Sequence, residues 1–144
     1  MPRLSFCLAA AALSLLTAGA AAAGPVVSGA WWRAMPAHLP AGGYFELKND
    51  SAAPLSLVGA ASPACGMVML HQSKHMGGMA HMVEVTSIDV PPGGKVSFAP
   101  GGYHLMCMQP TAAMTPGANV PVTLKFADGT RLTVTFAVRD TGGH

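Results

Sequence analysis

Charged residues are scarce in this 144-residue sequence, with 6 acidic and 8 basic residues, which together make 10% of the chain. Aromatic residues are also few, at 6%. The sequence contains no Ser/His/Asp arrangement, no carboxylate pair and no phosphate-binding loop, so no nucleophile or general base has an evident partner. We therefore predict that the protein is not an enzyme.

Long apolar runs are absent except for residues 4–16 near the start. A basic start, Met1–Arg3, precedes that run, and Ala21–Ala23 follows it as an A-x-A-type cleavage site. This layout predicts a secretory signal peptide over residues 1–23 and a periplasmic protein. The run is shorter than the roughly 20 residues that cross a bilayer, so we expect no membrane span after cleavage. Cys7 lies inside the run and not just after a cleavage site, which argues against a lipid anchor.

Cleavage would leave residues 24–144, the size of one domain with a single core. Because Arg3 is lost, 7 basic residues remain against 6 acidic residues, a net charge of +1. So small a charge does not suggest nucleic acid or an anionic membrane as a partner. No internal repeat or linker is visible, so we expect one domain and a monomer.

Short apolar segments alternate with Gly, Pro, Asn and Asp along the rest of the chain. The predicted strands cover residues 26–33, 42–48, 55–60, 67–72, one or two strands within 83–90, then 95–99, 103–109, 120–126 and 132–138. The last two alternate apolar and polar residues on either side of Asp128–Gly129, which predicts a hairpin. Many short strands with frequent turns predict an all-β fold, an antiparallel β-sandwich or Greek-key barrel.

Methionine and histidine are the residues in excess, at 10 and 6. They concentrate between Met69 and Met108. Thioether sulfur is a soft donor that selects copper(I) over zinc, magnesium or calcium, and imidazole also suits copper. A thioether carries no proton near neutral pH and is not lost to disulfides in an oxidising compartment. This composition favours a copper(I) site outside the cytoplasm.

Strand parity indicates which side chains share a face. In the strand 103–109, His104 and Met106 point one way and Leu105 and Cys107 point the other. We therefore expect His104 and Met106 to bind one ion together, just after the turn at Gly101–Gly102, with Leu105 in the core. By the same reasoning His71 emerges on the outer side near the end of its strand.

The spacing of these residues is similar to that of a known family. His71, Met82, His104 and Met106 follow the pattern His, ten residues, Met, twenty-one residues, His, one residue, Met. The sequence thus resembles the periplasmic copper chaperones of the PCuAC family over nearly all of the mature chain. Met82 depends mainly on this spacing, because Met76 and Met79 compete with it locally.

The resemblance implies a cupredoxin-like β-sandwich that binds one copper(I) ion per chain through two His and two Met. It also implies delivery of copper toward the copper A centre of cytochrome c oxidase. The partners would be cytochrome c oxidase subunit II or a Sco-type protein.

Other readings of the Met and His residues stay open. His75, Met76, Met79 and His81 are either solvated loop residues or a second, weaker copper(II) site. If the loop bound several ions, the protein would be a periplasmic copper buffer or resistance protein. An adhesion or scaffold module whose methionines only pack would ignore copper.

The two cysteines outside the leader, Cys65 and Cys107, are candidates for a disulfide in an oxidising compartment. Parity is awkward, since Cys107 faces the core and Cys65 shares the parity of His71, although Pro63 places Cys65 before the regular strand. The rival reading makes Cys107 a thiolate ligand of a blue-copper electron carrier. Parity opposes it, since Cys107 points away from His104 and Met106.

Overall fold

The computed structural model describes residues 23–144, so the predicted signal peptide lies outside the described residues except for its last one. Within residues 23–144, ten strands follow one another with a single short 3-10 helix, η1 (Pro36–His38). The strands are β1 (Pro25–Arg33), β2 (Ala41–Asn49), β3 (Leu55–Ala61), β4 (Cys65–Met76), β5 (Met79–Glu84), β6 (Ile88–Val90), β7 (Lys95–Phe98), β8 (Tyr103–Pro110), β9 (Asn119–Phe126) and β10 (Arg131–Arg139). The all-β prediction is confirmed.

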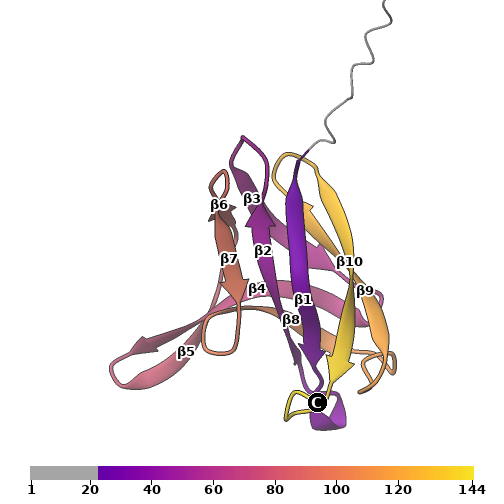
Figure 1. The fold of residues 1–144 in the computed structure, drawn as a ribbon. Helices are drawn as coiled ribbons and strands as arrows, with labels where there is room; N and C mark the ends of the chain where they lie inside the picture. Colours follow the sequence, from indigo (N-terminus) through magenta and orange to yellow (C-terminus); the bar gives the residue numbers. More distant parts are fainter. Residues whose placement is uncertain (1–22) are drawn as a thin grey trace, which may run out of the picture.

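Eight strands close into a barrel in the order β4-β8-β7-β2-β1-β10-β9-β3, and a pairing of β3 with β4 completes the ring. Two further strands lie beside the ring: β5 pairs with β4, and β6 pairs with β3 (Figure 1). Most pairings are antiparallel, but β1 with β10 and β7 with β8 run parallel. The barrel is therefore mixed and not purely antiparallel as predicted.

Alternation of buried and exposed residues builds the core. In β9, Val120, Val122 and Leu124 are buried and their neighbours are more exposed. The predicted hairpin with β10 is confirmed, since Val122 lies opposite Val134 and Leu124 opposite Leu132. Side chains at every second position of a strand point to the same face, so this pattern turns one face of each strand inward.

The two tryptophans at the end of β1 lie on opposite faces, as parity predicts. Trp32 is fully buried, and its indole lies over Gly43, where an added Cβ would come within 2.6 Å of the ring. Trp31 stays half-buried on the outer face, 4.9 Å from the ring of Tyr44. This outer face continues across β2 and β8 to β4.

Strands β4 and β5 form a hairpin that projects from the barrel (Figure 1). No strand was predicted between residues 72 and 83, and loop positions were expected for His75, Met76, Met79 and His81 in one reading; this is wrong, because the ladder continues to the pair Met76–Met79. The two turn residues Gly77 and Gly78 have φ values of 61° and 78°, which glycine adopts without steric cost. The Gly77–Gly78 pair was a signal for a hairpin turn in the sequence. The flanking strands could not be recognised, because their side chains are exposed on both faces and do not alternate between apolar and polar.

Candidate metal centre

The strands β4 and β8 place two histidines side by side. His71 lies opposite His104 in the antiparallel register, so the two side chains share the outer face. Their ring centroids are 5.7 Å apart, edge to face. A metal–nitrogen bond to imidazole is about 2 Å long, so two rings that share an ion have centroids roughly 5 to 6 Å apart. The spacing of the two rings fits one shared ion.

Both rings present a buried nitrogen without a protein partner. His104 Nδ1 donates to the Gly102 carbonyl oxygen at 3.3 Å, which leaves Nε2 with its lone pair. Nε2 of His104 and Nδ1 of His71 are both buried and form no hydrogen bond. Leaving such an atom unpaired costs about 1–3 kcal/mol, and either ring nitrogen of a neutral histidine can bind a metal ion. The Gly102 hydrogen bond also fixes the ring, as metal-ligating histidines require.

The two methionines of the predicted site lie on the same face. Met106 is opposite Met69 on β4, two positions from the histidine pair. Met82 of β5 is opposite Ser73, which is two residues beyond His71 on β4. Met82, His104 and Met106 line one pocket of about 270 Å³ beside the turn at Pro100 and Gly101. The structure thus places all four predicted residues on one face, with three of them lining one pocket and His71 beside His104.

Inward neighbours of the site hold β8 in position. Leu105 and Cys107 are both fully buried, which confirms the predicted parity of this strand. His104 is only 4% exposed, so it is more enclosed than an outward position on a barrel suggests. Met82, by contrast, is 62% exposed on the hairpin. The site therefore combines enclosed imidazoles with an accessible thioether.

Burial of the His104 ring lowers its pKa below the usual imidazole value, and the nearby His71 adds to this, while the hydrogen bond to Gly102 opposes it. A lowered pKa keeps the imidazole neutral, the form that binds metal. The metal-free fold must therefore exclude a proton that the unfolded chain accepts. The pKa of the unfolded histidine is about 6.5.

Metal-free protein is expected to lose stability as the pH falls from 7.5 to 5, because below about 6.5 the unfolded chain takes up a proton at His104 before the folded chain does. Chemical denaturation at the two pH values measures this change. His104→Leu should reduce the pH dependence. His38→Gln, which replaces an exposed imidazole, should keep it; an unchanged slope in His104→Leu would contradict this account of His104.

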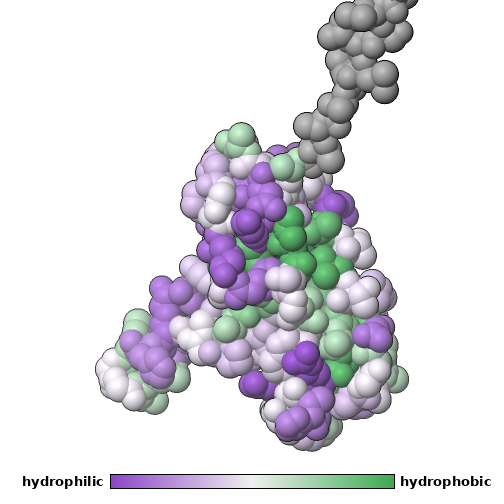
Figure 2. Space-filling view, in the orientation of Figure 1, coloured by the Kyte–Doolittle hydropathy of each residue, from purple (hydrophilic) through white to green (hydrophobic). Residues whose placement is uncertain are grey.

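The candidate second site is not assembled in one place. Met76 lies opposite Met79, and His81 opposite Lys74, on one face of the hairpin. His75 is on the other face, which is the face of the main site. All four candidate residues, His75, Met76, Met79 and His81, are exposed. Figure 2 shows hydrophobic side chains at the tip of this hairpin beside hydrophilic ones.

A disulfide joins Cys65 and Cys107, whose Cα atoms are 5.4 Å apart. Cys65 is the first residue of β4 and lies opposite Pro110, and its bond to Cys107 shows that the parity argument does not hold at this end of the strand. Cys107 is turned into the core and bonded there, and it does not reach the face of His104. The bond ties together the two strands that carry the histidines.

No three residues among His, Cys, Asp and Glu gather to form a metal site within residues 23–144. Glu84, the nearest carboxylate in sequence terms, is opposite His71 in the ladder but exposed. A metal ion held here by more than the two imidazoles would need the thioethers. This donor set matches a soft ion and not zinc or calcium.

Among the pocket residues that the sequence did not predict are Arg33 and Tyr44. They come from β1 and β2, which pair with each other through Arg33–Gly42 and Trp31–Tyr44. Gly42 is in turn opposite Met106 on β8. A sequence pattern cannot reveal this lateral register, although the small residue pair Gly42–Gly43 in an otherwise regular strand is a signal of close approach.

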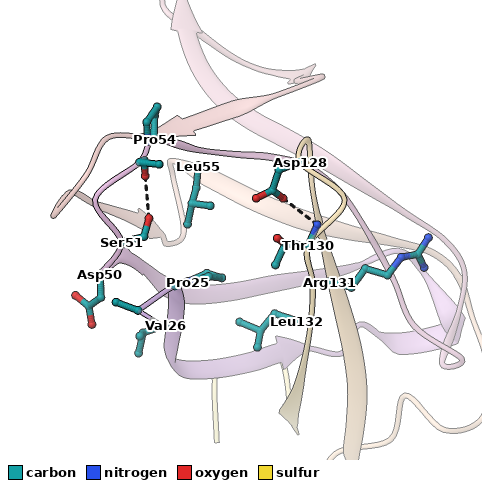
Figure 3. A pocket seen from close by; sticks show the side chains of 13 residues that line it. Pro25, Val26, Asp50, Ser51, Pro54, Leu55, Asp128, Thr130, Arg131 and Leu132 are labelled. Carbon is teal, nitrogen blue, oxygen red and sulfur yellow. Dashed lines mark hydrogen bonds between the residues drawn. The ribbon is translucent and has the colours of Figure 1, made fainter. Parts of the chain in front are cut away.

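A larger cavity, of about 740 Å³, lies elsewhere on the barrel. It is lined by the start of β1 and by the loops after β2 and β9, with Asp50 and Asp128 at its margin (Figure 3). Its Asp128 carboxylate accepts a hydrogen bond from the Thr130 amide. None of the predicted metal-site residues lines it, and its wall includes Ala23, where the described chain begins. We assign it no role.

Comparison with known proteins identifies the family. A family model described as "Putative lipoprotein LpqE-like" matches residues 26–138. The chain belongs to the LpqE-like family. A relative from Leifsonia xyli subsp. xyli, described as "Putative lipoprotein Lxx21020", is 34% identical over 131 residues, which cover 90% of this chain and 78% of the relative.

Solved structures of PCuAC proteins have a fold similar to that of this chain. The solution structure of CuI-DR1885 from Deinococcus radiodurans has a TM-score of 0.66 and 35% identity, covering 85% of this chain and 81% of that one. The copper-bound PCuAC domain from PmoF2 has a TM-score of 0.67 at 24% identity, covers 84% of this chain and 97% of that domain, and supports the fold alone. The resemblance to PCuAC proteins is confirmed.

LpqE-like relatives are described as lipoproteins, a class that lies outside the cytoplasm. Across residues 23–144, the structure contains no helix of the length and apolarity needed to cross a membrane.

Proposed function

We propose that this LpqE-like protein is a periplasmic copper(I) chaperone that binds one ion through His71, Met82, His104 and Met106. The observation that carries the proposal is the pair of buried, unpartnered imidazole nitrogens on facing strands, His71 Nδ1 and His104 Nε2. Two thioethers on the same face complete a neutral donor set that suits copper(I). A solved structure described as CuI-DR1885, 35% identical to this chain, supports the same choice of ion.

The geometry suits transfer better than storage. Two imidazoles and Met106 lie on the ladder of β4 and β8, while Met82 lies on the projecting hairpin and is 62% exposed. A weakly held, exposed ligand can be displaced by an incoming donor while the other three hold the ion. No anion has to be reprotonated when a thioether leaves, since its sulfur carries no proton.

The copper recipient is a further part of the proposal. By family resemblance, we propose that copper passes toward the copper A centre of cytochrome c oxidase, through subunit II or a Sco-type protein. Comparing oxidase assembly at low copper in cells with and without the gene tests this step. Normal oxidase assembly in cells that lack the gene would show that the copper A centre is not the recipient.

A copper buffer is the second candidate, favoured by the exposed methionines of the hairpin, Met76 and Met79, which are 53% and 65% exposed. Stoichiometry separates the two roles. We expect titration with copper(I) against a competing chelator to give about one tight equivalent per chain, the number that one four-donor site holds. Met76→Leu/Met79→Leu should leave that value unchanged. Several tight equivalents, lost in this double variant, would establish a buffer in place of a chaperone.

A further inference from the structure

The pocket that contains the metal donors has a second wall of different chemistry. Met82, His104 and Met106 form one side, and Arg33 and Tyr44 line the same pocket from β1 and β2. The proposed metal site uses neutral donors alone. The role of a positively charged residue beside it is therefore not explained by metal binding.

The register shows how Arg33 comes to face the site. Arg33 is opposite Gly42, and Gly42 is opposite Met106, so the three residues form one row across β1, β2 and β8. Partner residues in neighbouring strands share a face, and Gly42 has no side chain to separate the outer two. The Tyr44 hydroxyl occupies the space over Gly42, where an added Cβ would be 2.7 Å from it. The two ends of this row, Met106 and Arg33, line the same pocket.

Aromatic rings hold the Arg33 guanidinium. It lies 5.3 Å from the ring centroid of Trp31 and 5.4 Å from that of Tyr44. In the described part of the chain Arg33 forms no ion pair with a carboxylate, and its Nε is buried without a partner. An arginine fixed in this way, with its charge uncompensated, is prepared to receive an anion.

The site's chemistry limits which anion fits. Copper(I) held by neutral donors keeps its charge of +1, so Arg33 opposes the loaded state and favours a visiting negative group. The visitor must also be a soft ligand to compete for copper(I). A thiolate meets both conditions, whereas a carboxylate is a hard donor.

We propose that Arg33 is a positioning residue that draws the cysteine thiolate of a copper-exchanging molecule into this pocket. This inference rests on the proposed copper(I) function. The thiolate sulfur donates a lone pair to copper(I) as the Met82 sulfur leaves with its own. Copper stays in the +1 state, and the proton of the incoming thiol passes to the solvent as the thiolate forms. Exchange converts a cationic complex into a neutral one.

The test measures the rate at which thiols remove copper(I) from the loaded protein. The thiols are glutathione, which is anionic, cysteamine, which is not, and a synthetic dicysteine peptide flanked by glutamates. Arg33→Gln should slow removal by the anionic thiols about tenfold or more, in line with electrostatic steering, and change cysteamine much less. The rate in the native protein should also fall more steeply with ionic strength than in the variant.

Two control variants separate charge from packing. Arg33→Lys keeps the charge and should retain most of the rate. Arg139→Gln removes the other guanidinium that stacks on Trp31, at 5.0 Å, but Arg139 does not line the pocket, so removal should proceed as in the native protein. The copper(I) affinity of Arg33→Gln should equal or exceed the native value, since a repulsive charge is gone. A purely structural role would weaken binding.

Two results would overturn the inference. If Arg33→Gln releases copper to all three thiols at the native rate, Arg33 does not steer the ligand, and the chaperone function still stands. If the native protein retains no copper(I), the proposed function fails, and this inference fails with it. An Arg33 effect seen with the peptide and not with glutathione supports a protein thiolate as the ligand; the reverse supports a small thiol.

Discussion

His104→Ala is expected to weaken copper(I) binding by at least about 100-fold, because changing a residue that only supports a metal ligand already costs 10–100-fold. The variant removes a nitrogen that is buried and has no other partner. It also removes the ring fixed by the Gly102 carbonyl. Competition with a copper(I) chelator of known affinity measures the loss.

His75→Ala provides the matched control for this variant. His75 lies on β4, on the same outer face as His71, but farther along the exposed hairpin. Its removal should leave the affinity within about twofold of the native value, as changes at independent sites do. Equal losses in His75→Ala and His104→Ala would show that copper binds to the Met/His hairpin in general and not to a defined site.

Replacing both cysteines, Cys65→Ala/Cys107→Ala, is expected to lower the free energy of unfolding by about 2–4 kcal/mol. The bond closes a segment with a sequence separation of 42, which restricts the unfolded chain. For a domain of this size the melting temperature should fall by roughly 10 °C. Thermal unfolding of the metal-free protein, followed by circular dichroism, measures the change.

Copper affinity provides the control for the disulfide variant. Well below its melting temperature the variant should still bind one copper(I) ion, because Cys107 faces the core and not the site. Native protein treated with a reductant should lose stability to a similar extent. Loss of copper binding in a variant that remains folded would return Cys107 to consideration as a ligand.

The barrel could be predicted where one face of a strand is buried. Strands β9 and β10 alternate clearly because their inner residues, such as Val122 and Phe136, are buried and their outer ones are polar or half-buried. Strand β5 has no buried residue, so its sequence carries no alternation to read. The parallel pairing of β1 with β10 could not be predicted, since it joins the two ends of the chain and depends on how the barrel closes.

The site was predictable to a similar degree and for similar reasons. His104 and Met106 follow from strand parity, because the buried Leu105 between them fixes which face they occupy. Met82 depended mainly on the family spacing, and the hairpin register places it on the face of His71. Arg33 lies far from these residues in sequence, so only the lateral pairing through β2 brings it to the pocket.

The attachment of the β4–β5 hairpin allows two properties of the protein to vary independently. Strand β5 pairs with β4 alone at the end of the sheet, so its residues contribute little to the core. We expect substitutions there to alter how long copper stays bound at the proposed site, with little effect on the fold. Substitutions along β8 affect the fold and the site together, because Leu105 and Cys107 lie between the ligands and the core. The residence time of copper at the proposed site is thus the property that we expect sequence change to adjust most freely.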